Sequence, residues 1–143
     1  MSTKKKQEQK TLLPSDDERI ICSLRYDTRQ DLLILFIPSH DKNQKNLSDQ
    51  NMWAEAAMKT IGDLFGGATA FKALTGVYKS DADGKLLHDN PIVVESYVAR
   101  DDIENPDRLR ALTEFAKRMG RETNQEAVGL VLNNCIHFIK DYK

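Results

Sequence analysis

The residues of this chain best suited to acid–base chemistry are Glu95, Glu126 and His40. Glu95 lies inside an apolar stretch, Glu126 stands at the start of a later apolar run, and His40 follows a third. Burial raises the pKa of a carboxyl group, which can then act as an acid or a base near neutral pH. These three residues are the catalytic candidates. In the alternative interpretation, Glu95 faces water or pairs with Lys72 or Lys79 on the adjacent strand.

The metal-binding and nucleophilic patterns in the sequence are incomplete. Cys135 and His137 would share one face of a strand, but zinc requires four ligands, or three and a water, and no further ligand has a recognisable spacing. Asp81 and Asp83 look like the start of a calcium loop that lacks its closing glutamate. The G-x-S-x-G pattern of a serine nucleophile is absent. We therefore predict no metal site and no cofactor.

Three aromatic residues, Trp53, Tyr78 and Tyr97, are candidates for binding because tryptophan and tyrosine are enriched in interfaces. Glu95 is also a binding candidate, because it lies on the same face of one strand as Tyr97. Alternation divides this strand into two faces: Ile92, Val94, Ser96 and Val98 point toward the core, and Val93, Glu95, Tyr97 and Ala99 point the other way.

The stretch 65–99 organises the rest of the chain as two long strands joined by a tight turn. Its first strand is predicted over 68–79, which is rich in β-branched and aromatic residues. Residues 80–84 have the Asp and Gly composition of a turn. The second strand resumes at residue 86 and is interrupted at Pro91, which has no N–H for a sheet, so the regular strand is expected from Ile92 onward.

Two amphipathic helices flank this hairpin. The first is predicted over 50–65, and Gly66 ends it because glycine accepts the positive φ of a helix C-terminus. A glycine at this end of a helix argues against a phosphate-binding loop, which requires a helix N-terminus. The second helix is predicted over 106–120, with Asn105 as its N-cap and Gly120 as its end.

Further strands are predicted over 18–26, 31–38, 125–132 and 135–139, and residues 100–105 are predicted as a charged loop. The middle of this order, β-α-β-β-α-β, resembles the ferredoxin-like arrangement, an antiparallel sheet with two helices on one face. We therefore predict an α+β fold with this core, an extra N-terminal strand and a C-terminal hairpin strand.

Length and composition predict one domain. The chain has 143 residues, of which 40% are hydrophobic and 30% charged, as in ordinary soluble globular proteins. We expect a single domain over 18–140, preceded by a disordered, lysine-rich tail over 1–17. The formal net charge of −1 argues against nucleic acid as a partner. No apolar run has the length of a transmembrane helix or follows a signal pattern. Two distant cysteines, Cys22 and Cys135, predict reduced thiols in the cytoplasm.

These observations favour a non-catalytic interaction module that self-associates, most simply as a homodimer, or binds a protein partner through its open sheet face. Two helices cannot cover both faces of the sheet, and an apolar face left in water would be unusual for a monomer.

The alternative hypothesis is a small enzyme or a small-molecule-binding protein. Its pocket would lie between the open sheet face and the loop 39–50, with Glu95 as acid or base and with His40, Tyr78 and Tyr97 orienting the ligand. A third hypothesis, RNA binding on the sheet, has less support because the aromatic and basic pattern of RNA-binding sheets is absent.

Overall fold

The structure, a computed structural model, describes residue 15 and residues 28–143. Its elements in chain order are β1 (Asp31–Ile37), α2 (Gln50–Phe65), β2 (Thr69–Lys72), β3 (Gly76–Lys79), β4 (Leu86–Asp89), β5 (Ile92–Val98), α3 (Arg100–Ile103), α4 (Pro106–Glu122), β6 (Val128–Leu132) and β7 (Cys135–Ile139). The predicted tail over 1–17, apart from Ser15, and the predicted strand over 18–26 lie outside the described residues.

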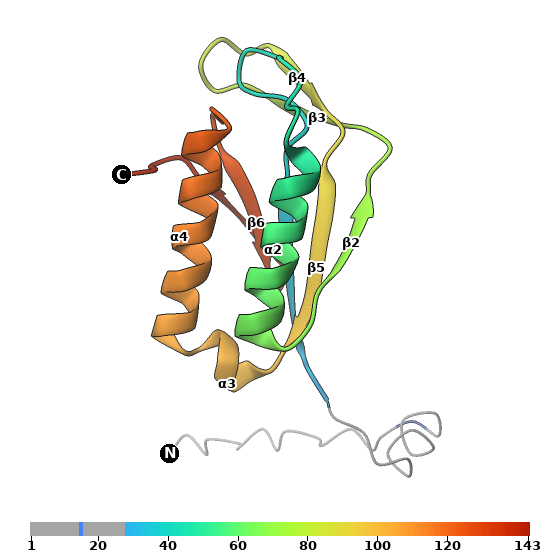
Figure 1. Cartoon of the computed structure of the whole chain (residues 1–143), viewed down its shortest axis with the longest axis vertical. Helices are drawn as coiled ribbons and strands as arrows, with labels where there is room; N and C mark the ends of the chain where they lie inside the picture. Colours follow the sequence, from blue (N-terminus) through green and yellow to red (C-terminus); the bar gives the residue numbers. More distant parts are fainter. Residues whose placement is uncertain (1–14, 16–27) are drawn as a thin grey trace, which may run out of the picture.

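The main sheet has five strands in the order β2-β5-β1-β6-β7, and every neighbouring pair is antiparallel. Helices α2 and α4 lie side by side against one face of it (Figure 1). Strands β2, β5, β1 and β6 with these helices form the predicted ferredoxin-like core, and β7 is the predicted C-terminal hairpin strand. The fold class read from the sequence is therefore confirmed.

The core lies between the sheet and the two helices. Along β1 the burial alternates, with Leu33, Leu35 and Ile37 fully buried beneath the helices. The facing residues of β5, Val94 and Val98, are also fully buried. Full burial of each such side chain contributes about 1.5–3 kcal/mol, so this layer supplies much of the driving force for folding.

Helix α2 has the predicted bounds and the predicted glycine end. Gly66 has a φ of 95°, and its N–H donates to the carbonyl oxygen of Gly62. Its N-cap, Asp49, makes no capping bond and instead accepts a hydrogen bond from the indole Nε1 of Trp53 at 3.1 Å.

Helix α4 begins as predicted, because the side chain of Asn105 accepts hydrogen bonds from the backbone N–H groups of Asp107 and Arg108. The prediction that Gly120 ends this helix is wrong, since α4 continues to Glu122. Gly120 serves packing instead: a Cβ atom there would lie 2.3 Å from Cε1 of Tyr142. The predicted charged loop over 100–105 contains the short helix α3.

The predicted strand over 68–79 is not continuous. It divides into β2, which pairs with β5 in the main sheet, and β3, which pairs with β4 in a separate two-stranded sheet. The break lies opposite Pro91, whose carbonyl oxygen accepts a hydrogen bond from the N–H of Ala73 at 2.9 Å. The β3–β4 hairpin lies at one end of the main sheet, beside the loop that follows β1 (Figure 1). Gly84 in its turn has a φ of 71°.

No helix within the described residues is long and apolar enough to cross a membrane.

Candidate functional site

The structure places Trp53 in the core and not on a binding surface. Its side chain is 4% exposed, and its ring meets Phe115 of α4 edge to face, with ring centres 5.9 Å apart. The guanidinium group of Arg118 lies over both rings. Trp53 therefore joins the two helices, and its proposed role in binding is corrected to a structural one.

Glu95 and Tyr97 lie on the face of the main sheet that the helices leave uncovered, which we call the open face. Glu95 stands between Ile34 of β1 and Thr69 of β2, and Tyr97 is 57% exposed. Neither residue lines any of the three cavities described below. The structure therefore does not bring Glu95 together with the other catalytic candidates.

A cavity of about 330 Å³ lies at one end of the open face, between the main sheet and the β3–β4 hairpin. Phe36, Ile136 and Phe138 line it from the sheet, and Val77 and Tyr78 line it from the hairpin. We call it the sheet–hairpin cavity. Its size lies at the lower end of the range for small-molecule pockets, and its largely apolar walls with a few polar groups are typical of such pockets.

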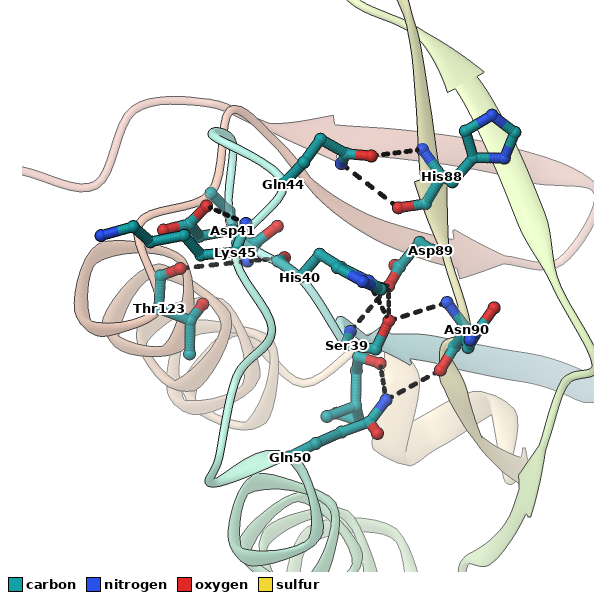
Figure 2. A network of polar contacts seen from close by, with 12 residues as sticks. Ser39, His40, Asp41, Gln44, Lys45, Gln50, His88, Asp89, Asn90 and Thr123 are labelled. Atoms are coloured by element: carbon teal, nitrogen blue, oxygen red, sulfur yellow. Dashed lines mark hydrogen bonds and ion pairs between the residues drawn. The ribbon is translucent and has the colours of Figure 1, made fainter.

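Among the described residues that line this cavity, Asp89 alone carries a charge. One carboxylate oxygen of Asp89, Oδ1, accepts hydrogen bonds from the backbone N–H of Ser39 at 2.6 Å and from the Ser39 hydroxyl at 2.5 Å. Figure 2 shows these two side chains directed toward each other. The same hydroxyl accepts a hydrogen bond from the N–H of Asn90 at 2.8 Å. Asp89 is thus held in one orientation at the end of β4.

His40 belongs to the same polar network. Its Nδ1 lies 2.6 Å from the Ser39 hydroxyl and 3.9 Å from Oδ1 of Asp89 (Figure 2). Because that hydroxyl already donates its hydrogen to Asp89, His40 must be the donor in the contact with Ser39. In a Ser-His-Asp triad the histidine accepts the serine proton and the aspartate binds its second nitrogen. The arrangement here is different, so the network positions Asp89 and does not activate Ser39.

Gln125 is the second polar side chain held at the cavity. Its Nε2 donates to the carbonyl oxygens of His40 at 2.8 Å and Thr123 at 3.1 Å, which uses both hydrogens of the amide. The side-chain oxygens left without a protein hydrogen bond, Oδ2 of Asp89 and Oε1 of Gln125, are both acceptors. In the described part of the chain, the Tyr142 hydroxyl is the one side-chain polar atom that is both buried and without a hydrogen-bond partner. Since Oδ2 of Asp89 and Oε1 of Gln125 also have no such partner, they are not buried.

Tyr78 and Glu126 lie close to each other but have different roles. Tyr78 lines the sheet–hairpin cavity, and burial, followed by the negative charges of Glu126, Asp89 and Asp81, raises the pKa of its phenol. Glu126 precedes β6, and its Oε1 accepts hydrogen bonds from the Ser80 hydroxyl and from the backbone N–H of Asp81, both at 3.0 Å. Glu126 therefore holds the turn of the β3–β4 hairpin, while Tyr78 is available to a ligand.

Two wider hollows, of about 650 and 700 Å³, are more open to solvent. His40 lines the first and Glu126 the second. Within the described residues, no group of three or more His, Cys, Asp or Glu side chains could hold a metal ion.

The sequence did not single out Asp89 or Gln125 as site residues. Asp89 stands next to the Asn90-Pro91 break, where its residue type was typical of a turn. The sequence signal that could have located Asp89 is the Asn90-Pro91 break. A proline interrupts the pairing of a strand, so the chain can leave the sheet there and direct a nearby side chain into a cavity.

Comparison with known proteins gives a match at the level of structure. A phage SAM lyase in complex with S-methyl-5'-thioadenosine matches with a TM-score of 0.58 and 13% identity, over 82% of this chain and 94% of that chain. The apo state of a phage SAM lyase matches with a TM-score of 0.56 and 14% identity over the same shares. No protein-family model matches the chain, and no curated protein sequence matches it.

At this identity the likeness establishes the fold alone. The matched structures are nevertheless those of an enzyme that acts on a small molecule, and the match extends over 82% of this chain. This finding contradicts the hypothesis of a non-catalytic interaction module. It favours the alternative hypothesis of a small enzyme or a small-molecule-binding protein with a pocket on the sheet face.

Proposed function

We propose that this protein is a small enzyme that binds an adenosyl sulfonium compound, S-adenosylmethionine, in the sheet–hairpin cavity and cleaves it to S-methyl-5'-thioadenosine. The observation that carries this proposal is the composition of the cavity. Its walls are aromatic and aliphatic, and its accessible side-chain oxygens at Asp89 and Gln125 are fixed acceptors.

Such a cavity suits a ligand with an aromatic body and a positive charge. Phe36, Tyr78 and Phe138 offer faces on which a nucleobase can stack and toward which a cation is attracted. Asp89 supplies a negative charge in a largely apolar setting, where an opposite charge is attracted more strongly than in water. S-adenosylmethionine combines an adenine ring with a positively charged sulfur.

The reaction requires little acid–base assistance at sulfur. When the carbon–sulfur bond breaks, its electron pair moves to the positively charged sulfur, which leaves as a neutral thioether and needs no proton. In the same step the substrate's own carboxylate bonds to the carbon that the sulfur leaves, so the fragment departs as a lactone and no proton is transferred. The chain's contribution is to hold the substrate in one conformation and exclude water, since orientation alone can lower a barrier substantially. Glu95 has no place in this proposal.

The test is to incubate the purified protein with S-adenosylmethionine and to measure S-methyl-5'-thioadenosine by chromatography, against a blank without protein. We expect protein-dependent product. Gly129→Ala should lower kcat/KM by about tenfold, because one extra methyl in a substrate pocket has an effect of this order. Its Cβ would lie 3.1 Å from Cδ2 of Phe36.

The matched control is Gly67→Ala, whose Cβ would meet no atom within 4 Å. It should retain wild-type kcat/KM. If the product does not exceed the blank at any enzyme concentration, the proposed function is wrong.

The expectation of a homo-oligomer stays a prediction. What supports it is the exposure of Phe71 (48%), Tyr97 (57%) and Ile136 (49%), all on the open face. An apolar surface of this kind is typical of an interface.

A further inference from the structure

The acceptor groups of the sheet–hairpin cavity have a consequence for selectivity. Asp89 Oδ1 is occupied by two hydrogen bonds from Ser39, and Oδ2 is left for a ligand. The amide of Gln125 is fixed with its oxygen free, because both of its hydrogens are bound. Neither group can turn to offer a hydrogen bond donor, so both attract positive charge and neither donates a hydrogen bond to an acceptor on the ligand.

From this geometry we infer that Asp89 is the residue that distinguishes the charged sulfonium from the neutral thioether, and so distinguishes substrate from product. The inference rests on the proposed function. The substrate and the product share the adenosine portion, which the aromatic walls contact equally. They differ at sulfur, which loses its positive charge when the carbon–sulfur bond breaks. The attraction to Asp89 disappears in the same step, and the product is released.

This role is one of binding and not of bond breaking. The positive charge on sulfur decreases toward the transition state, so the attraction to Asp89 is stronger in the bound substrate than in the transition state. An interaction of this kind lowers KM without raising kcat. Asp89→Asn should therefore raise KM and leave kcat unchanged or slightly higher. A general base at this position would show the opposite pattern, with a large loss in kcat.

Ser39 is the positioning residue for Asp89. Its hydroxyl and backbone N–H fix the carboxylate, and the side chain of Asp89 is 23% exposed, so the carboxylate would otherwise have room to turn toward solvent. Ser39→Ala removes one of the two bonds and keeps the charge. It should weaken the selectivity for sulfonium by less than Asp89→Asn does.

The experiment compares two ligands that differ only in a methyl group and a charge. They are S-methyl-5'-thioadenosine and its S-methylated dimethylsulfonium form, which lacks the amino acid chain of S-adenosylmethionine. Isothermal titration calorimetry gives the dissociation constant of each. We expect the wild-type protein to bind the sulfonium at least about tenfold more tightly, as for a unit charge near a partly buried carboxylate.

In Asp89→Asn this preference should fall to about twofold or less, while the affinity for the neutral thioether stays the same. Asparagine has the shape of aspartate and keeps an acceptor for Ser39, so the fold should persist. The matched control is Asp63→Asn, which removes an exposed carboxylate from α2, outside the cavity, and should keep the wild-type preference. If Asp89→Asn fails to fold, a reduced preference in Ser39→Ala supports the inference and an unchanged preference overturns it.

Two other outcomes separate this inference from the proposed function. If the wild-type protein produces S-methyl-5'-thioadenosine but binds both ligands equally, the inference alone is wrong. The same holds if Asp89→Asn weakens both ligands by the same factor. If the wild-type protein binds neither ligand and forms no product, both proposals are wrong.

Discussion

Tyr142 combines close packing of its ring with a buried hydroxyl that has no hydrogen-bond partner in the described part of the chain. Its ring packs against Gly120 of α4, where no larger residue would fit. Its hydroxyl is the one buried side-chain polar atom there without a hydrogen-bond partner. Burial, followed by the charges of Tyr78 and Glu126, raises the pKa of this phenol to about 12. The apolar ring stabilises the packing of the C-terminal residues, while the hydroxyl opposes it.

Replacing Tyr142 with Phe should therefore stabilise the protein at neutral pH by about 1 kcal/mol, because an unpartnered buried hydroxyl is lost and the ring remains. The wild-type protein should also lose stability between pH 10 and 12, since the unfolded chain releases this proton near 10.0 and the folded chain only near 12. The variant should lack that part of the loss. Urea denaturation at neutral and at alkaline pH measures both effects. A destabilised variant at neutral pH would show that the hydroxyl has a partner.

Among the strands, the decisive feature is the break between β2 and β3. Composition identified β-branched and aromatic residues over 68–79 but did not show that the chain leaves the main sheet within that range. The sequence did locate the cause, because Pro91 interrupts the opposite strand. The direction in which the chain bends between β2 and β3 could not be predicted from the sequence. It depends on tertiary contacts such as those of Glu126 with the turn at 80–82.

Glu126 therefore sets the position of the β3–β4 hairpin relative to the main sheet. Glu126→Ala should speed amide hydrogen exchange at Asp81 by about tenfold or more, because hydrogen bonds to a charged group contribute about 1.5–3 kcal/mol. Exchange at Ala82 should rise less, because its N–H also donates to the Ser80 hydroxyl. Exchange in the buried part of β1 should not change. The control is Glu55→Ala, which removes an exposed glutamate from α2 and should leave all of these amides unaffected. Equal exchange in the two variants would mean that other contacts hold the turn.

The architecture of the protein was predictable from its sequence, and the site was not. The alternation along Ile92–Val98, the Asn105 cap and the apolar run over 31–38 are local signals, and they are sufficient to specify a sheet with two helices on one face. The sheet–hairpin cavity instead joins residues from β1, β3, β7 and the loop after α4. Residues so far apart in the sequence show no spacing pattern from which their proximity in the fold could be predicted. Of the residues first considered for the site, Tyr78 is the one that lines it.

The open face also bears on association between copies of the protein. If the protein forms homo-oligomers through this face, Tyr97→Glu should weaken association by several kcal/mol, because a charge would be buried there without a partner. Light scattering at micromolar concentration measures the molar mass of the wild type and the variant. A monomeric wild-type protein would contradict the prediction and would leave the open face exposed to solvent.

The separation of the two sheets gives the molecule a modular character. The hairpin that forms one wall of the cavity carries its own hydrogen-bonded ladder, and no strand of the main sheet pairs with it. Its strands can therefore lengthen or shorten without altering the register of the core strands, provided that the turn at 80–82 keeps its hydrogen bonds to Glu126. A family built on this plan would be free to vary the range of ligands it accepts through the hairpin alone, and the same independence makes this wall the natural place to engineer a new specificity.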